Sequence, residues 1–72
     1  MNQSPWTPAE LDSVVIPEAT AREHGVIPSG TIVWHVPGAR YATVECTEVD
    51  GRPGLDTQLV DVPLEDLRLD RN

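Results

Sequence analysis

Apolar and polar residues alternate along several short segments of this chain, with the period of two that a pleated strand imposes on its two faces. The clearest segment is 41–47, where Ala42, Val44 and Cys46 alternate with polar or aromatic residues. This pattern is typical of a strand with one face in the core and the other in solvent. Residues 58–62 also alternate, with Gln58, Val60 and Val62 on one face and Leu59 and Asp61 on the other, but this pattern does not define which face points inward. We therefore expect a strand at each of these two segments.

Two further segments have strand character. In 31–36, Trp34 is in phase with the apolar residues Ile32 and Val36. That phase predicts that Trp34 points into the core, with a place on the surface as the alternative. Upstream, residues 12–16 end in a β-branched run, which favours a first strand.

Turn signals indicate how these segments connect. Asp50-Gly51 and Pro53-Gly54 are dipeptides typical of hairpin loops. The three strands that follow the first one should therefore form an antiparallel meander. Pro28 and Gly30 fit the middle of a tight turn that leads into this meander. The whole run from Gly30 to Leu69 predicts a small closed sheet.

Helical signals are short. Residues 17–25 begin with Pro17 and end with Gly25, which are favoured at the start and the stop of a helix, so a short helix or an ordered loop is expected there. A second helical turn is expected at Leu64–Leu67. Near the start of the chain, residues 7–10 read Thr-Pro-Ala-Glu, which fits a capping box and predicts one helical turn.

The length of 72 residues suits one domain. Residues 1–10 are expected to be a flexible lead that includes the helical turn, and residues 11–72 to form the domain. The first residues lack the basic and apolar regions of a signal peptide, and no apolar run approaches the roughly 18 residues of a membrane span. The single cysteine, Cys46, has no partner for an internal disulfide. These features predict a cytoplasmic protein.

The charge balance is strongly acidic. Five arginines and no lysine stand against twelve acidic residues, for a net charge of −7. Because the arginines are scattered, they lack the clustering that binding to a phosphate backbone requires, which disfavours nucleic acid as a direct partner. An acidic surface would attract a basic protein partner. Alternatively, the acidic surface only keeps the protein soluble.

Several segments together resemble a known family. They are Leu11–Val15, Gly25–Val33, Val44–Cys46, Asp50-Gly51 and Leu64–Arg68. Over roughly residues 11 to 69, the chain resembles domain of unknown function 4926, a small uncharacterised bacterial family whose members look like SH3-like barrels. The resemblance implies an all-β fold, namely a small SH3-like antiparallel barrel with one or two short helical turns. It implies no established activity.

One departure from the family pattern points to candidate binding residues. The family usually has an aromatic-x-Val-Glu-Phe strand, whereas this chain has Ala-Thr-Val-Glu-Cys at 42–46, with Tyr41 one residue earlier. A shift of one residue turns a side chain to the opposite face, so we expect Tyr41 to be exposed, with a place in the core as the alternative. Tyr41, Arg40 and Glu45 then form a candidate partner-binding surface, because SH3-like barrels that bind peptides present aromatic grooves beside acidic residues. Trp6 is a fourth candidate, either as a partner anchor or as a cover over one end of the barrel.

The chain carries no recognisable motif for catalysis or metal binding. His24, His35 and Cys46 lack the close pairing that zinc ligands show. The adjacent carboxylates Glu65 and Asp66 would need a pocket that separates their pKa values before they could act as acid and base. No glycine-rich loop has the lysine of a phosphate-binding loop. We therefore predict no catalytic residue, no metal and no cofactor.

These expectations describe a non-enzymatic protein-interaction module of the cytoplasm. Its charge suits the acidic partner of a basic protein, as an antitoxin or an immunity protein would be. The alternative is a nucleic-acid-associated or ribosome-associated SH3-like barrel, against which the absence of lysine argues. An accessory subunit of a larger enzyme is a third class.

Overall fold

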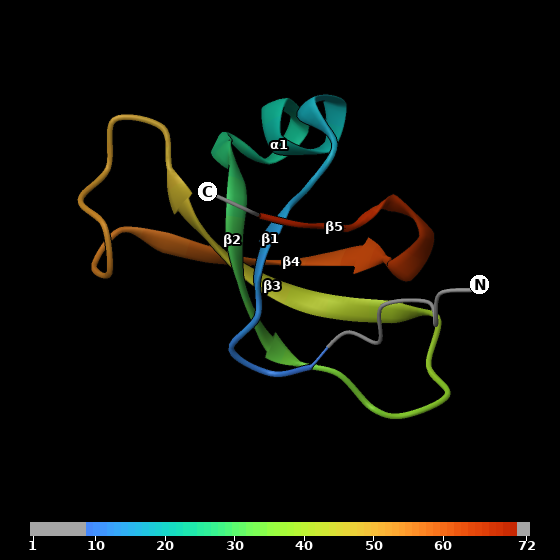
Figure 1. Cartoon of the computed structure of the whole chain (residues 1–72). Helices are drawn as coiled ribbons and strands as arrows, with labels where there is room; N and C mark the ends of the chain where they lie inside the picture. The colour runs from blue at the N-terminus through green and yellow to red at the C-terminus, as the bar shows by residue number, and fades with distance from the viewer. Residues whose placement is uncertain (1–8, 71–72) are drawn as a thin grey trace.

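The computed structural model describes residues 9–70 and shows one mainly β domain (Figure 1). Its strands are β1 (Ser13–Val15), β2 (Val26–Trp34), β3 (Tyr41–Glu48), β4 (Thr57–Pro63) and β5 (Arg68–Leu69). Helix α1 (Glu18–His24) joins β1 to β2, and a 3-10 turn, η1 (Leu64–Asp66), joins β4 to β5. The predicted all-β class with short helical turns is confirmed. Trp6 lies before residue 9, and the capping box predicted at residues 7–10 includes residues 7 and 8. Both predictions therefore lie outside the described residues.

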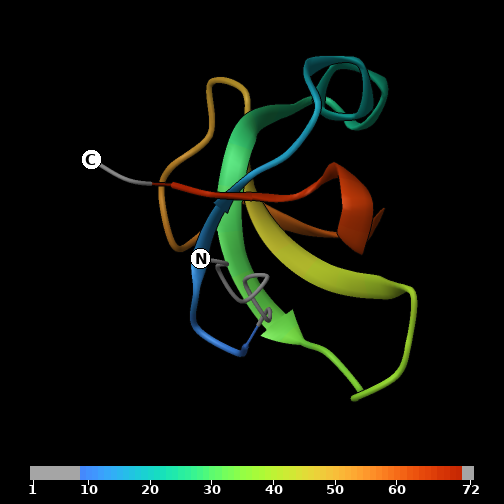
Figure 2. The same cartoon turned by 45° about the vertical axis from the view of Figure 1, so that its right-hand side comes forward.

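The five strands form a single antiparallel sheet in the order β4-β3-β2-β1-β5. β2, β3 and β4 form the predicted meander, and β1 and β5 extend the sheet on the other side of β2 (Figure 2). Within the described residues, β4 and β5 are the two edges and do not pair with each other. The prediction of a closed sheet is therefore wrong. β5 has only two residues. At the end of β4, Pro63 has no N–H with which to donate a hydrogen bond from the free edge to another strand.

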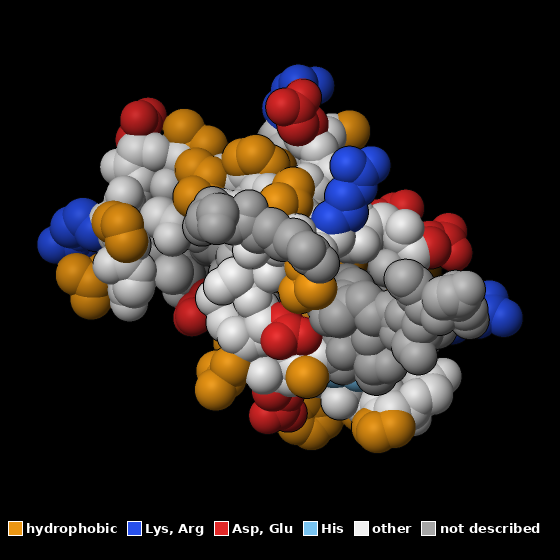
Figure 3. Space-filling view, in the orientation of Figure 1, with side chains coloured by type: hydrophobic (Ala, Val, Ile, Leu, Met, Phe, Trp, Pro, Cys, Tyr) orange, Lys and Arg blue, Asp and Glu red, His pale blue; other side chains and the backbone are white. Residues whose placement is uncertain are grey.

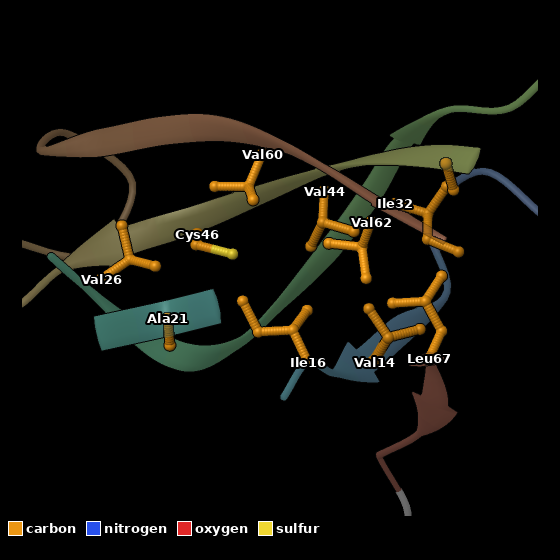
Figure 4. Packing of buried hydrophobic residues seen from close by; sticks show 11 residues of the cluster. Val14, Ile16, Ala21, Val26, Ile32, Val44, Cys46, Val60, Val62 and Leu67 are labelled. Carbon is orange, nitrogen blue, oxygen red and sulfur yellow. The ribbon is translucent and has the colours of Figure 1, made fainter. Parts of the chain in front are cut away.

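The core lies inside the curl of this sheet. Figure 4 shows the buried side chains gathered between β3 and β4 on one side and β1, α1 and the segment before β5 on the other. The core residues are Val14, Ile16, Ala21, Val26, Ile32, Ala42, Val44, Cys46, Val60, Val62 and Leu67. The apolar row of β3 is thus buried as predicted. No polar or charged residue is buried in the described part of the chain.

Helix α1 follows its sequence signals closely. Pro17 lies at its N-cap, and Gly25 ends it with a φ of 69°, a left-handed conformation that glycine adopts without a steric penalty. The N–H of Gly25 bonds to the carbonyl oxygens of Ala21 and Arg22, which closes the last turn. Ala21 packs into the core. Of the two structures expected for this segment, the helix is confirmed.

Gly30 has a different role from the predicted one. It lies inside β2 rather than in a tight turn, so the predicted turn is wrong and the chain reverses through α1 instead. A Cβ atom at this position would collide with the carbonyl oxygen of Glu45 and lie 2.8 Å from Cγ1 of Val44. Gly30 is therefore required by the close approach of β2 and β3, which is a common reason for glycine within a strand.

Trp34 also departs from its predicted place. Its side chain is 60% exposed, so the prediction of a core tryptophan is wrong. Ile32 pairs with Val44, but Trp34 pairs with Thr43, one residue out of that register. The irregularity is a β-bulge, which adds one residue to β2. An added residue reverses the alternation of faces, and Trp34 consequently lies on the outside of the sheet.

Candidate interaction surface

The outer face of the β2-β3-β4 meander carries a set of residues that we call the outer sheet face. Its members share the face opposite the core, and they are Trp34, Tyr41, Thr43, Glu45, Leu59 and Asp61. The ladder places them in rows, because paired residues of neighbouring strands project from the same side. Thr43 lies between Trp34 and Asp61, and Glu45 lies opposite Leu59.

Three large side chains of the outer sheet face are open to solvent. Trp34 is 60% exposed, Tyr41 55% and Leu59 65%. Trp34 and Tyr41 lie close together, since Trp34 pairs with Thr43 and Tyr41 is two residues from Thr43 on the same face. Trp34 and Tyr41 thus form an exposed aromatic pair beside polar groups, which is typical of interaction sites, and Leu59 lies further along the same face, opposite Glu45. The exposure predicted for Tyr41 is confirmed.

Two carboxylates of this face are oriented by hydrogen bonds across strands. Thr43 Oγ1 donates to Asp61 Oδ1 at 2.6 Å, and Thr57 Oγ1 donates to Glu45 Oε2 at 3.2 Å. A hydroxyl donor satisfies only part of a carboxylate's capacity to accept hydrogen bonds. Both groups can therefore still accept a hydrogen bond from a cationic side chain.

A hollow of about 460 Å³ adjoins the same face at the start of β3. Arg40 and Tyr41 line it on one side, and Pro63, Leu64 and Glu65 on the other. The chain is fixed there because the N–H of Leu64 donates to the carbonyl oxygen of Arg40 at 2.8 Å. The hollow thus combines an aromatic wall with one group of each charge.

The structure brings together some of the predicted site residues and separates others. Arg40 and Tyr41 line one hollow, as adjacent residues can. Glu45 shares the outer sheet face with Tyr41 but lies four residues further along β3, roughly 13 Å away by the rise of an extended strand. It lines a second hollow, of about 360 Å³, whose other walls are largely serine and threonine side chains. The fourth predicted residue, Trp6, lies outside the described residues.

Sequence reasoning missed three members of the outer sheet face. The alternation in β2 predicts a core position for Trp34, because the bulge has no evident signal in the sequence. Leu59 and Asp61 carry a signal, since they alternate with Val60 and Val62, which are buried. That phase defines an outward row on β4 once the inward row is known.

Cys46 does not provide a reactive group. Its side chain is fully buried in the core, and burial, followed by the negative charge of Glu45, raises the pKa of its thiol. A raised pKa lowers the fraction of thiolate, which is the nucleophilic form. In residues 9–70, no three His, Cys, Asp or Glu side chains gather closely enough to hold a metal ion.

The charged side chains are dispersed over the surface. Figure 3 shows the blue basic groups of this view at separate places, with red carboxylates between them. Arg52 is engaged locally, because its Nε forms an ion pair of 3.0 Å with Asp56 Oδ2. The visible face thus has no basic patch of the kind that follows a nucleic-acid backbone.

Comparison of the chain with protein-family models, curated proteins and solved structures finds no match. None of the helices in the described range has the length and apolar character that a membrane span requires.

Proposed function

We propose that this chain is a non-enzymatic protein-interaction module that binds a basic protein partner through its outer sheet face. The observation that carries the proposal is the exposure of Trp34, Tyr41 and Leu59 on one face of the β2-β3-β4 meander, which also carries the carboxylates of Glu45 and Asp61. Tryptophan and tyrosine are enriched among the residues that dominate binding energy at protein interfaces. The carboxylates would add attraction and orientation for a cationic partner.

The net charge supports the same class of partner. A charge of −7 on 72 residues favours encounter with a basic protein and disfavours approach to phosphate groups. An acidic antitoxin or immunity protein, which neutralises a basic protein in the cytoplasm, fits these properties. We propose this role for the chain.

We also propose an SH3-like fold and membership of domain of unknown function 4926. In support, five antiparallel strands enclose one core, and β2 pairs with both β1 and β3. A short helical turn separates β4 from the brief β5. The sheet then corresponds to a partly open version of the barrel.

An affinity pull-down from lysate of the source cells tests the proposed function. The full chain is immobilised, and the lysate is applied with and without nuclease. We expect a basic protein that survives nuclease treatment and elutes with salt. Recovery of proteins only through RNA or DNA that nuclease removes would refute the proposal and favour a nucleic-acid-associated barrel. The pull-down is repeated with Trp34→Ala, which should recover less of the partner. Leu55→Ala is the control, because Leu55 is also exposed (69%) but lies in the loop between β3 and β4, away from the outer sheet face.

A further inference from the structure

β4 is a seven-residue strand with one unpaired edge. Residues Thr57–Pro63 pair with β3 along their whole length, and no other described strand pairs with them. An unpaired edge presents a row of main-chain N–H and C=O groups, which can template the addition of another strand. At the other end of the sheet, β5 has only two residues. β4 is therefore the long edge of this sheet.

The main-chain groups that face this edge can be identified. The N–H of Glu48 bonds to the carbonyl oxygen of Asp56 at 2.8 Å, so this pair is a hydrogen-bonded one. Bonded and non-bonded pairs alternate along an antiparallel ladder. The even-numbered residues of β4 therefore direct their main-chain groups toward β3. Thr57, Leu59 and Asp61 direct theirs toward the free edge.

The position of Pro63 supports this assignment of the main-chain groups of β4. Pro63 follows Asp61 by two residues, so its nitrogen also lies on the free side of β4. Proline is tolerated in a strand where the missing N–H would have faced solvent. Pro63 thus limits the edge at one end, while Leu59 and Asp61 keep their N–H donors at its centre. The side chains of these two residues belong to the outer sheet face.

We infer that the free edge of β4 accepts an extended segment of the basic partner as an additional strand. This inference rests on the proposed function and specifies how the partner binds. Main-chain hydrogen bonds to Leu59 and Asp61 would supply the pairing, and alternate side chains of the partner would supply the selectivity. The partner residue opposite Leu59 is apolar, and the residue opposite Asp61, two positions away on the same face, is Lys or Arg.

Charge selects a basic partner rather than a second copy of this chain. Two copies joined at β4 would bring together two surfaces of net charge −7, with Asp61 and Glu45 of each copy near the junction. Like charges across a sheet destabilise pairing. A cationic side chain placed beside Asp61 instead has a carboxylate that Thr43 already holds in position. The strand that the edge accepts is therefore basic and amphipathic.

Amide hydrogen exchange on the full chain, followed by NMR, tests the inference directly. The probe is a synthetic peptide of about ten residues built from Thr-Val-Thr-Lys repeats, which places valine and lysine alternately on one face. Without peptide, we expect fast exchange at Leu59 and Asp61 and slow exchange at Val60 and Val62. With saturating peptide, exchange at Leu59 and Asp61 should slow about tenfold or more. Protection at Leu59 and Asp61 before any peptide is added, or peptide binding that leaves them unprotected, would overturn the inference.

Two control peptides separate pairing from simple charge attraction. Replacing every lysine by glutamate should abolish binding, because it places like charges opposite Asp61. N-methylation of alternate main-chain nitrogens keeps the charge but removes the donors and should also abolish binding. Equal binding of the N-methylated and unmodified peptides would show that strand addition is not the mode.

Two substitutions at Leu59 test the edge in the protein itself. Leu59→Pro removes the edge-facing N–H, whereas Leu59→Ala removes the apolar side chain and keeps the N–H. We expect Leu59→Pro to weaken peptide binding about tenfold relative to Leu59→Ala. Equal affinities of two folded variants would contradict the inference. If Leu59→Pro does not fold, as judged by circular dichroism, the exchange measurement on the unsubstituted chain decides.

The outcomes for the inference and for the proposed function are distinguishable. A basic partner recovered by pull-down that Trp34→Ala weakens and Leu59→Pro does not would refute strand addition and leave the proposed function intact. Absence of any nuclease-resistant basic partner, together with no peptide binding, would refute both. A dimer in sedimentation that Leu59→Pro dissociates would assign the edge to a second copy and overturn the inference.

Discussion

Trp34 lies opposite Thr43, one residue out of the register that would have placed it beside the buried Ala42. The bulge after Ile32 causes this shift. The alternation of residues in β2 predicts that Trp34 faces the core, but the bulge places its side chain on the outer sheet face. Bulges often re-aim a side chain at a functional site, and here the re-aimed residue is the largest aromatic of the described chain. Its position beside Tyr41 creates the aromatic part of the proposed interface.

The exposure of Trp34 predicts a small effect on stability. We expect Trp34→Ala to change the free energy of unfolding by less than about 1 kcal/mol, as most surface substitutions do. Ile32→Ala, in the same strand but fully buried, should cost about 2 to 5 kcal/mol. Urea denaturation of both variants measures the contrast. A loss of about 3 kcal/mol or more for Trp34→Ala, which is typical of a core tryptophan, would contradict the bulged register.

Gly30 should be intolerant of a side chain. Gly30→Ala places a Cβ against the main chain of Glu45, which cannot move without separating β2 from β3. We expect a loss of about 1 to 3 kcal/mol in the free energy of unfolding, the usual range for overpacking. Ser29→Ala, at the neighbouring half-buried position, is the control and should change stability by less. Equal effects would show that the two strands are not in close contact at Gly30.

The sequence predicts those parts of the fold that depend on local signals. Ala42, Val44 and Cys46 define the buried row of β3 by alternation alone, and Pro17 and Gly25 bound the helix between them. Each of these features depends on residues adjacent in the chain. Their physical causes, the pleat of a strand and the caps of a helix, act over the same short range.

The errors concern features set by contacts between distant strands. The bulge before Trp34 and the close approach at Gly30 depend on how β2 meets β3, and neither has its own signal in β2. The edges of the sheet likewise depend on which strands pair, so the pattern from Gly30 to Leu69 does not indicate that the sheet stays open. The sequence therefore predicts only part of the candidate surface. It predicts the exposed position of Tyr41, because Tyr41 alternates with the neighbouring buried row of β3.

Cys46 should be unreactive in the folded protein. Burial and the charge of Glu45 both raise the pKa of its thiol, so the thiolate is scarce at pH 8. Reaction with Ellman's reagent should be very slow in buffer and complete within minutes in concentrated urea. Rapid labelling of the folded chain at pH 8 would show that the core around Cys46 opens readily or that the thiol is exposed.

Asp56 should titrate below the ordinary range of an aspartate. Hydrogen bonds from the side chain and then the main chain of Arg52 lower its pKa. Because the folded state holds this carboxylate in its ionised form, the stabilisation is complete above about pH 4 and is lost as the pH falls through the lowered pKa. An NMR titration should give a midpoint below about 3.9, which Arg52→Ala raises. A midpoint at or above that value would contradict the Arg52 contacts.

The central claim is that the outer sheet face binds a basic protein partner, and one binding measurement tests it most directly. The affinity of the partner recovered by pull-down is measured by titration calorimetry for the unsubstituted chain, Trp34→Ala, Tyr41→Ala and Leu55→Ala. We expect each aromatic substitution to weaken binding at least about tenfold, as loss of an interface hot spot does, and Leu55→Ala to leave it unchanged. Unchanged affinity in both aromatic variants, with the fold intact, would contradict the claim.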